Sequence, residues 1–283
     1  MVKGALLINK NEGCTSRQID VEISKKFHTK KVGHLGTLDP FAEGLLIVFI
    51  NSGTKIIPFL KDERKTYVAT LKLGILTDTL DKDGKIILEE NVPVITKEQI
   101  EDVLKSFLGE NEQIPPMYSS IKINGKHLYD LARRGIEIER TPRKINIYSI
   151  KLISFTKDEI IFEATVSKGT YIRTLGNDIA HKLNTIGHLT KLIRTNIDQF
   201  SLNDAKRVED ICEDDVKSID EILSFMNKYK VYGPMEKIAL NGGKLFLIYK
   251  DDYLLIYNND GPIAIYGFES DGIYKCIRGL KWK

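Results

Sequence analysis

GHLGTLDPFAEGLLIVFI, at residues 33–50, joins a polar loop to a continuous apolar run. Two glycines within its first four residues allow positive φ or a close approach of the backbone to its neighbours. Pro40 restrains Asp39 away from helical geometry. Residues 45–50 are apolar without alternation, which predicts a strand buried on both faces. The stretch therefore predicts a carboxylate fixed in a loop next to a buried strand.

The chain up to residue 228 mixes helices and strands without a regular strand–helix–strand rhythm. This pattern favours an α+β fold over a doubly wound α/β sheet. Apolar spacing and strand-forming residues predict strands at residues 66–73, 145–155 and 159–167. Capping residues predict three helices. The helix at 16–27 has Ser16 as N-cap, and the helix at 96–108 begins with a capping box of Thr96 and Gln99. The helix at 170–183 has Thr170 as candidate cap.

Beyond residue 228 short strands follow one another, separated by Gly, Asn and Asp turns. Such close spacing favours a small β-barrel or sandwich. We therefore expect two domains, residues 1–228 and 229–283. The strands expected in the second lie at residues 245–249, 253–257, 263–268 and 274–278.

The composition is that of a soluble globular protein, because 42% of the 283 residues are hydrophobic and 29% are charged, with a net charge of +3. No apolar run approaches the ~18 residues that a membrane-spanning helix needs, and we expect no signal peptide. The three separate cysteines suit a reducing cytoplasm. Because the familiar phosphate-loop, dinucleotide and zinc motifs are missing from the sequence, we expect neither a metal nor a cofactor.

Two basic clusters interrupt the nearly neutral charge balance. One comprises Lys25, Lys26, Lys30 and Lys31, and the other sets eight Lys or Arg residues against three acidic ones between residues 121 and 151. Local basic patches on a nearly neutral protein suggest a polyanion bound over part of the surface. A solvated, lysine-rich surface explains either patch alone equally well.

Three residues are candidates for chemistry without a cofactor. Asp39 suits a nucleophile or general base, and the alternative is an Asx turn in which it bonds its own backbone. Arg173, near Lys168 at a strand-to-helix junction, suits pairing with a carboxylate or another anion, and the alternative is a solvent-facing arginine. Tyr67 suits stacking on a base, although a tyrosine in a strand is more often simply part of the core.

Several segments resemble, in order, the motifs of bacterial tRNA pseudouridine synthases of the TruB type. They are GHLGTLDP at 33–40, KTY at 65–67, TDT at 77–79 with DKDG at 81–84, IPPMYSSIKINGKHLYDLARRG at 114–135 and SKGTYIRTLGNDI at 167–179. The resemblance covers roughly residues 4–200, and the tail is similar to that family's PUA-type RNA-binding domain. It implies an α+β core with a mixed, mainly antiparallel sheet, followed by a small β-barrel-like domain.

The resemblance also implies an activity, the isomerisation of uridine 55 in the T-loop of tRNA to pseudouridine. The base is flipped out, its N-glycosidic bond is broken, and the ring is rejoined through carbon 5. Asp39 matches the catalytic aspartate, Tyr67 the tyrosine that stacks on the base and is implicated in proton removal, and Arg173 the arginine that pairs with the carboxylate. The resemblance implies that His34 helps to hold the flipped-out nucleotide and that Leu192 lines the uracil pocket. The other residues expected to bind substrate are Lys10, Tyr171, Lys168 and Asp78.

One residue departs from the family pattern, because Asn11 follows Lys10 where the family has proline, so the loop loses a fixed φ. The expected partner is the T-arm of tRNA, bound by a monomeric cytoplasmic protein without an obligatory protein partner. Three rival functions stay open: a non-catalytic RNA-binding or RNA-folding protein, a guide-RNA-dependent synthase, and a glycosidase-type hydrolase that uses Asp39 with Asp78.

Overall fold

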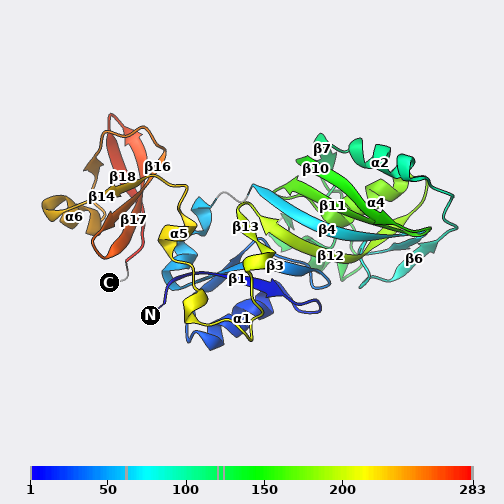
Figure 1. Cartoon of the computed structure of the whole chain (residues 1–283), viewed down its shortest axis with the longest axis horizontal. Helices are drawn as coiled ribbons and strands as arrows, with labels where there is room; N and C mark the ends of the chain where they lie inside the picture. The colour runs from blue at the N-terminus through cyan, green and yellow to red at the C-terminus, as the bar shows by residue number, and fades with distance from the viewer. Residues whose placement is uncertain (1, 61–62, 120, 124, 282–283) are drawn as a thin grey trace.

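The computed structural model describes residues 2–60, 63–119, 121–123 and 125–281. A large mixed sheet carries the N-terminal part, and a smaller sheet follows at the C-terminal end (Figure 1). In the described residues the larger sheet has the order β1-β3-β12-β4-β11-β10-β7, with β2 paired to β3 and β13 to β12. Its strands are β1 (Gly4–Lys10), β2 (Val32–Leu35), β3 (Glu43–Ile50), β4 (Arg64–Leu73), β7 (Gly109–Gln113), β10 (Arg143–Phe155), β11 (Glu159–Ser167), β12 (Gly187–Ile197) and β13 (Phe200–Ser201).

The described strand pairs of this sheet are antiparallel except for β3 and β12, which run parallel through Ile193 opposite Glu43 and Arg194 opposite Gly44. The predicted mixed, mainly antiparallel α+β fold is therefore confirmed. The continuous apolar run lies in β3, and both of its faces are covered as the sequence predicted. Leu46, Val48 and Ile50 pack with α1, whereas Leu45, Ile47 and Phe49 belong to a second core cluster.

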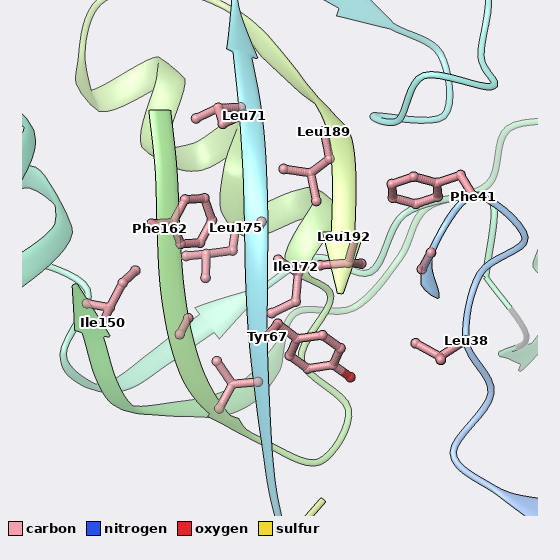
Figure 2. Packing of buried hydrophobic residues seen from close by; sticks show 14 of the residues in the cluster. Leu38, Phe41, Tyr67, Leu71, Ile150, Phe162, Ile172, Leu175, Leu189 and Leu192 are labelled. Atoms are coloured by element: carbon pink, nitrogen blue, oxygen red, sulfur yellow. The ribbon is translucent and has the colours of Figure 1, made fainter. Parts of the chain in front are cut away.

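Helices α2 (Lys97–Lys105) and α4 (Ile172–Lys182) pack on strands β10, β4 and β12, and α1 (Ser16–Lys26) packs on β2 and β3. Strand β4 alternates, so that Tyr67 and Leu71 are buried together with Phe162 of β11 and Leu175 of α4 (Figure 2). This period of two places one face of the strand against the helices.

Two predicted caps differ from those in the structure. The N-cap of α1 is Thr15, which forms a capping box with Gln18, because the Ser16 hydroxyl bonds the backbone of Leu38 instead. Helix α4 begins at Ile172 without a side-chain cap, because the Thr170 hydroxyl lies next to that of Ser167. The capping box of α2, formed by Thr96 and Gln99, is confirmed.

Short elements fill the connections between the strands of the larger sheet. Strands β5 and β6 form a hairpin that carries the turn at residues 78–85, and β8, β9 and α3 follow in the segment after Tyr118. Their bounds are β5 (Ile75–Thr77), β6 (Ile86–Glu89), β8 (Lys122–Ile123), β9 (Lys126–His127), α3 (Leu128–Ala132), and the 3₁₀ turns η1 (Asn51–Phe59), η2 (Leu202–Asp204) and η3 (Glu213–Asp215).

The C-terminal sheet has the order β14-β16-β17-β18-β15, which leaves β14 and β15 at opposite edges of an open sheet. Leu255 and Ile265 pack in one cluster with Ile219 of α5 and with residues of β1 and β3, so the two sheets share a core. Among the described residues, no helix is long and apolar enough to cross a membrane. The elements are α5 (Ile219–Ile222), β14 (Lys228–Lys230), α6 (Gly233–Leu240), β15 (Leu245–Phe246), β16 (Tyr253–Asn258), β17 (Gly261–Ser270) and β18 (Ile273–Gly279).

Candidate active site

The loop that carries Asp39 is fixed from two sides. On one side the Ser16 hydroxyl accepts a hydrogen bond from Leu38 N at 2.9 Å and lies 3.2 Å from the carbonyl of the same residue. On the other side the buried Arg194 donates from Nη2 to Gly36 O at 2.8 Å. Gly36 has a φ of +68°, and a Cβ there would lie 2.9 Å from Lys65 Nζ. The loop conformation therefore depends on glycine and on contacts from α1 and β12.

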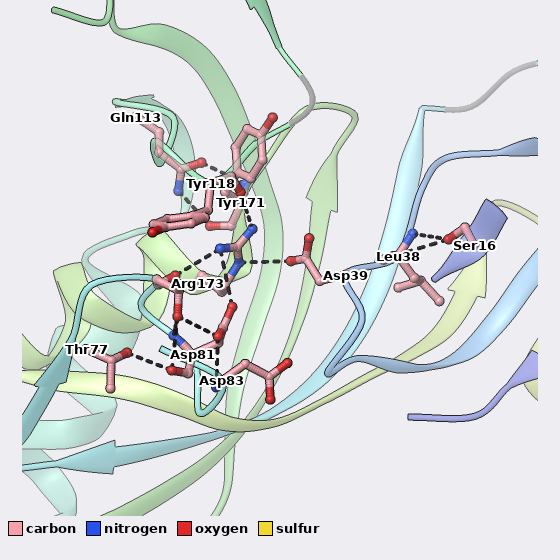
Figure 3. A network of polar contacts seen from close by, with 11 residues as sticks. Ser16, Leu38, Asp39, Thr77, Asp81, Asp83, Gln113, Tyr118, Tyr171 and Arg173 are labelled. Carbon is pink, nitrogen blue, oxygen red and sulfur yellow. Dashed lines mark hydrogen bonds and ion pairs between the residues drawn. The ribbon is translucent and has the colours of Figure 1, made fainter. Parts of the chain in front are cut away.

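The Asp39 carboxylate pairs with Arg173 of helix α4 (Figure 3). Arg173 Nε lies 2.9 Å from Asp39 Oδ2, as an ion pair whose N–H is not aligned for a hydrogen bond. The Arg173 side chain is 4% exposed and that of Asp39 is 35% exposed. The solvent-facing alternative for Arg173 is wrong, because its side chain is buried. The Asx-turn alternative for Asp39 is wrong as well, because the carboxylate is turned towards Arg173.

The other nitrogens of Arg173 contact three further groups. Nη1 donates to Thr79 O at 2.9 Å and lies 3.3 Å from Asp81 Oδ2, and Nη2 donates to Tyr118 O at 2.8 Å. A planar guanidinium with all three nitrogens engaged has little freedom to turn. Arg173 therefore presents a fixed positive charge to Asp39.

Asp81 is the second carboxylate on Arg173, and sequence reasoning did not single it out. Its side chain is 8% exposed, and its Oδ1 accepts from the Thr79 hydroxyl at 2.6 Å and from Asp83 N at 3.1 Å. Burial raises the pKa of Asp81, against the Thr79 hydrogen bond and the Arg173 charge, which lower it. The only sequence signal was its place in the DKDG segment at 81–84.

Tyr67 lies on β4 with its residue 8% exposed, in the core cluster that also holds Leu38 and Ile172, the chain neighbours of Asp39 and Arg173. It pairs in register with Ala164 of β11 and Arg194 of β12. Its ring lies near Ile172 and Leu192, and its hydroxyl points towards Leu38 of the Asp39 loop (Figure 2). Tyr67 is therefore a core residue whose ring edge faces that loop.

Two predicted substrate-binding residues lie in the loop region with different surroundings. His34 of β2 is partly exposed, and its ring nitrogens contact Asp20 and Thr37. Lys10 is fully buried, and its ammonium donates to the carbonyls of Asn11 at 2.9 Å, Cys14 at 2.8 Å and Pro40 at 3.4 Å. Burial lowers the pKa of Lys10. Through its bond to the Pro40 carbonyl, Lys10 therefore stabilises the Asp39 loop from the buried side.

Tyr171 and Lys168 lie where the chain enters α4. Gln113 holds the backbone of Tyr171 through two hydrogen bonds, from Tyr171 N at 2.8 Å and to Tyr171 O at 3.0 Å (Figure 3). Burial raises the pKa of the Tyr171 phenol, and the Asp39 charge raises it further. Lys168 is exposed in the turn that precedes Tyr171.

Asp78 lies apart from the Arg173 cluster. It is exposed, and its Oδ1 accepts from Lys85 N at 2.8 Å, which closes the turn after β5. The carboxylate brought to Arg173 is that of Asp81, three positions further along the chain. In the parts of the chain that the structure describes, no group of three His, Cys, Asp or Glu side chains is placed to hold a metal ion.

Comparison with known proteins decides the family. A family model described as "TruB family pseudouridylate synthase (N terminal domain)" matches residues 24–172. The chain belongs to this family. Its resemblance to TruB-type pseudouridine synthases is thereby confirmed.

Curated relatives match most of the chain. The protein named tRNA pseudouridine synthase B of Alkaliphilus oremlandii is 44% identical, with 89% of this chain and 85% of the relative covered. The protein of the same name from Clostridium tetani is 39% identical and covers 99% of this chain and 100% of the relative. The similarity thus extends over the C-terminal sheet as well.

Solved structures of lower identity share the fold. A chain in the crystal structure of a Cbf5-Nop10-Gar1 complex has a TM-score of 0.72 at 20% identity, with 98% of this chain and 85% of that chain covered. A chain in the structure of an archaeal box H/ACA sRNP Nop10-Cbf5 complex has a TM-score of 0.69 at 17% identity. These likenesses concern the fold alone.

Proposed function

We propose that this chain isomerises the T-loop uridine of tRNA to pseudouridine. The observation that carries the proposal is the ion pair between a buried Arg173 and a partly exposed Asp39, whose chain neighbours Ile172 and Leu38 pack in one cluster with Tyr67. The curated relatives that carry the name tRNA pseudouridine synthase B support tRNA as the substrate.

The reaction breaks the bond between N1 of uracil and C1′ of the ribose and forms a bond between C5 and C1′. The product loses the proton at C5 and gains one at N1, so the atoms balance without a co-reactant. Asp39 must be ionised to attack or to take a proton, and Arg173 supplies the positive charge that pairs with the carboxylate. Tyr67 stacks on the base and takes part in moving the C5 proton.

The target base must leave the RNA stack before Asp39 can reach it. Stacking on an aromatic side chain is worth about 1–3 kcal/mol, which offsets part of the cost of extrusion. Leu192 and Tyr67 form the apolar side of the site, and His34, Tyr171 and Lys168 contact the flipped nucleotide and its flanking phosphates. The burial of Lys10 and the turn contact of Asp78 favour supporting roles for these two residues.

The remaining features of the proposal concern partners and organisation. We place a catalytic domain at residues 1–228 and a PUA-type RNA-binding domain at residues 229–283, which carries four of the five strands of the smaller sheet in full. The protein acts on the T-arm as a cytoplasmic monomer and requires neither a guide RNA nor a second protein.

The test is single-turnover conversion of an unmodified tRNA transcript by wild type and by Asp39→Asn. We expect one T-loop pseudouridine from wild type alone, with both proteins binding the transcript equally. A Lys97→Gln variant on α2 is the matched control, because this exposed residue pairs only with Glu101 in the described structure. Release of free uracil would indicate a hydrolase, and binding without conversion by wild type would indicate an RNA-binding protein or a need for a guide RNA.

A further inference from the structure

Asp20 of helix α1 is a buried carboxylate that faces His34. Its side chain is 4% exposed, and its Oδ2 lies 2.9 Å from His34 Nδ1. Asp20 lies four residues after Ser16, which bonds Leu38, so both side chains project from the same face of α1. One face of this helix therefore contacts the Asp39 loop at Leu38 and the adjoining strand β2 at His34.

The few contacts that Asp20 makes do not compensate the free energy that burying its carboxylate costs the folded protein. Its Oδ1 is buried and has no hydrogen-bond partner among the described residues. Besides His34, the one described cation within ion-pair distance is Arg17, whose Nη1 lies 3.6 Å away on a side chain that is 77% exposed. A buried carboxylate with one unsatisfied oxygen is costly, and its main contact is His34.

The chemistry of this contact fixes the state of the imidazole. An ionised carboxylate can only accept hydrogen bonds, so His34 Nδ1 must carry the hydrogen. In the neutral ring this leaves Nε2 as an acceptor, and Nε2 lies 3.1 Å from the Thr37 hydroxyl. Asp20 thus sets both the orientation of the ring and its tautomer.

We propose that Asp20 is a positioning residue that acts through His34. It holds the imidazole with Nδ1 protonated and with Nε2 as an acceptor directed towards the Thr37 hydroxyl, so that the ring is fixed in one orientation before the RNA arrives. The inference rests on the proposed function, because it assumes that His34 contacts the flipped nucleotide. Asp20 itself touches no substrate.

A spectroscopic experiment tests the geometry independently of activity. In protein labelled with ¹⁵N-histidine, long-range ¹H–¹⁵N spectra report which ring nitrogen is protonated, and His34→Gln identifies the His34 signals. We expect the Nδ1–H tautomer in wild type and its loss in Asp20→Leu, because a leucine side chain has no oxygen to accept from Nδ1–H. An unchanged His34 tautomer in Asp20→Leu would overturn the proposal.

Kinetics then test the role. We expect Asp20→Leu to lower the single-turnover rate on bound tRNA roughly tenfold, as loss of a hydrogen bond to a charged group predicts, with little change in tRNA affinity. In the His34→Ala background, Asp20→Leu should cause no further loss. An equal loss in both backgrounds would show that Asp20 does not act through His34.

One control variant and one separate readout distinguish the outcomes. Ile23→Val trims a fully buried residue of the same helix that belongs to the core behind it, and it should leave the rate unchanged despite a small loss of stability. If wild type converts no tRNA, the proposed function fails, whereas the His34 tautomer still decides whether Asp20 positions the ring.

Discussion

Arg173 is buried and Asp39 is partly open to solvent, yet Arg173 Nε lies 2.9 Å from Asp39 Oδ2. Thr79, Tyr118 and Asp81 bind the Arg173 guanidinium. The Asp39 side chain is 35% exposed, so its carboxylate can be reached from the solvent. This asymmetry gives a carboxylate that has a fixed positive charge on one side and remains reachable by a substrate on the other. A nucleophile or base needs both a partner for its charge and access to its substrate.

Replacement of Arg173 by methionine should destabilise the protein by about 3 kcal/mol, because it leaves the Asp81 charge buried without its cation. Asp39 contributes less to this loss, since water can reach it. The double variant Arg173→Met/Asp81→Asn should recover most of the free energy of unfolding but not the activity. Urea unfolding measures both, and a double variant no more stable than Arg173→Met would refute the assignment to Asp81.

The pH dependence of stability should carry the signature of Asp81. Burial raises its pKa in the folded state above the ordinary value of about 3.9. The folded state therefore binds the proton more tightly than the unfolded state, and stability is lost as pH rises from about 4 through the raised pKa. Asp81→Asn should remove this loss, so its stability relative to wild type should increase over that window and then level off. A difference independent of pH between pH 3 and pH 7 would contradict the shift.

The parallel contact between β3 and β12 depends on Gly44. Its φ is +103°, and a Cβ there would lie 2.4 Å from Arg194 O and 2.9 Å from Arg194 N. Because both contacts are backbone atoms, Gly44→Ala should cost about 3 kcal/mol and reduce activity by moving Arg194. Gly261→Ala is the control, since its φ of +112° brings similar strain with nothing within 4 Å, and it should cost only about 1 kcal/mol. Equal losses of unfolding free energy in Gly44→Ala and Gly261→Ala, measured by urea unfolding, would show that backbone strain and not the contact with Arg194 sets the cost.

Tyr67→Phe separates stacking from proton handling. The phenyl ring keeps the packing of this buried residue, so tRNA affinity and the free energy of unfolding should stay within about 0.5 kcal/mol of wild type. The single-turnover rate should fall by about 10²-fold or more, as expected when a group that handles protons is removed. A wild-type rate in Tyr67→Phe would limit Tyr67 to stacking, which Tyr67→Leu would then test.

The basic cluster near α1 should contribute to RNA binding through charge. Lys25 and Lys30 are exposed, and changing each to glutamine should weaken tRNA binding and reduce the slope of log K against log salt by about 0.7–0.9 per phosphate contact. Lys26 differs, because its ammonium donates to Val208 O at 2.8 Å and Glu209 O at 2.6 Å, so Lys26→Gln should also lower stability. An affinity loss that does not depend on salt would contradict the phosphate contacts.

Local patterns were sufficient to predict several elements. The apolar run of β3 predicted a strand covered on both faces, and the capping box of Thr96 and Gln99 predicted the start of α2. These features depend on neighbours in the chain, whose hydrogen bonds and periodicity are visible in the sequence. The motif residues Asp39, Tyr67 and Arg173 were likewise readable as candidates.

Other residues were decided by the tertiary structure. Asp78 and Asp81 lie in the same polar turn, and only the approach of α4 brings Asp81, and not Asp78, to Arg173. Lys10 and Asp20 carry charges typical of surfaces, yet both are buried where β1 and α1 meet the catalytic loop. The sequence alone thus determined the family motifs and the local elements, because these depend on adjacent residues. The partners of each buried charge depend on contacts between segments distant in the chain, which exist only in the folded protein.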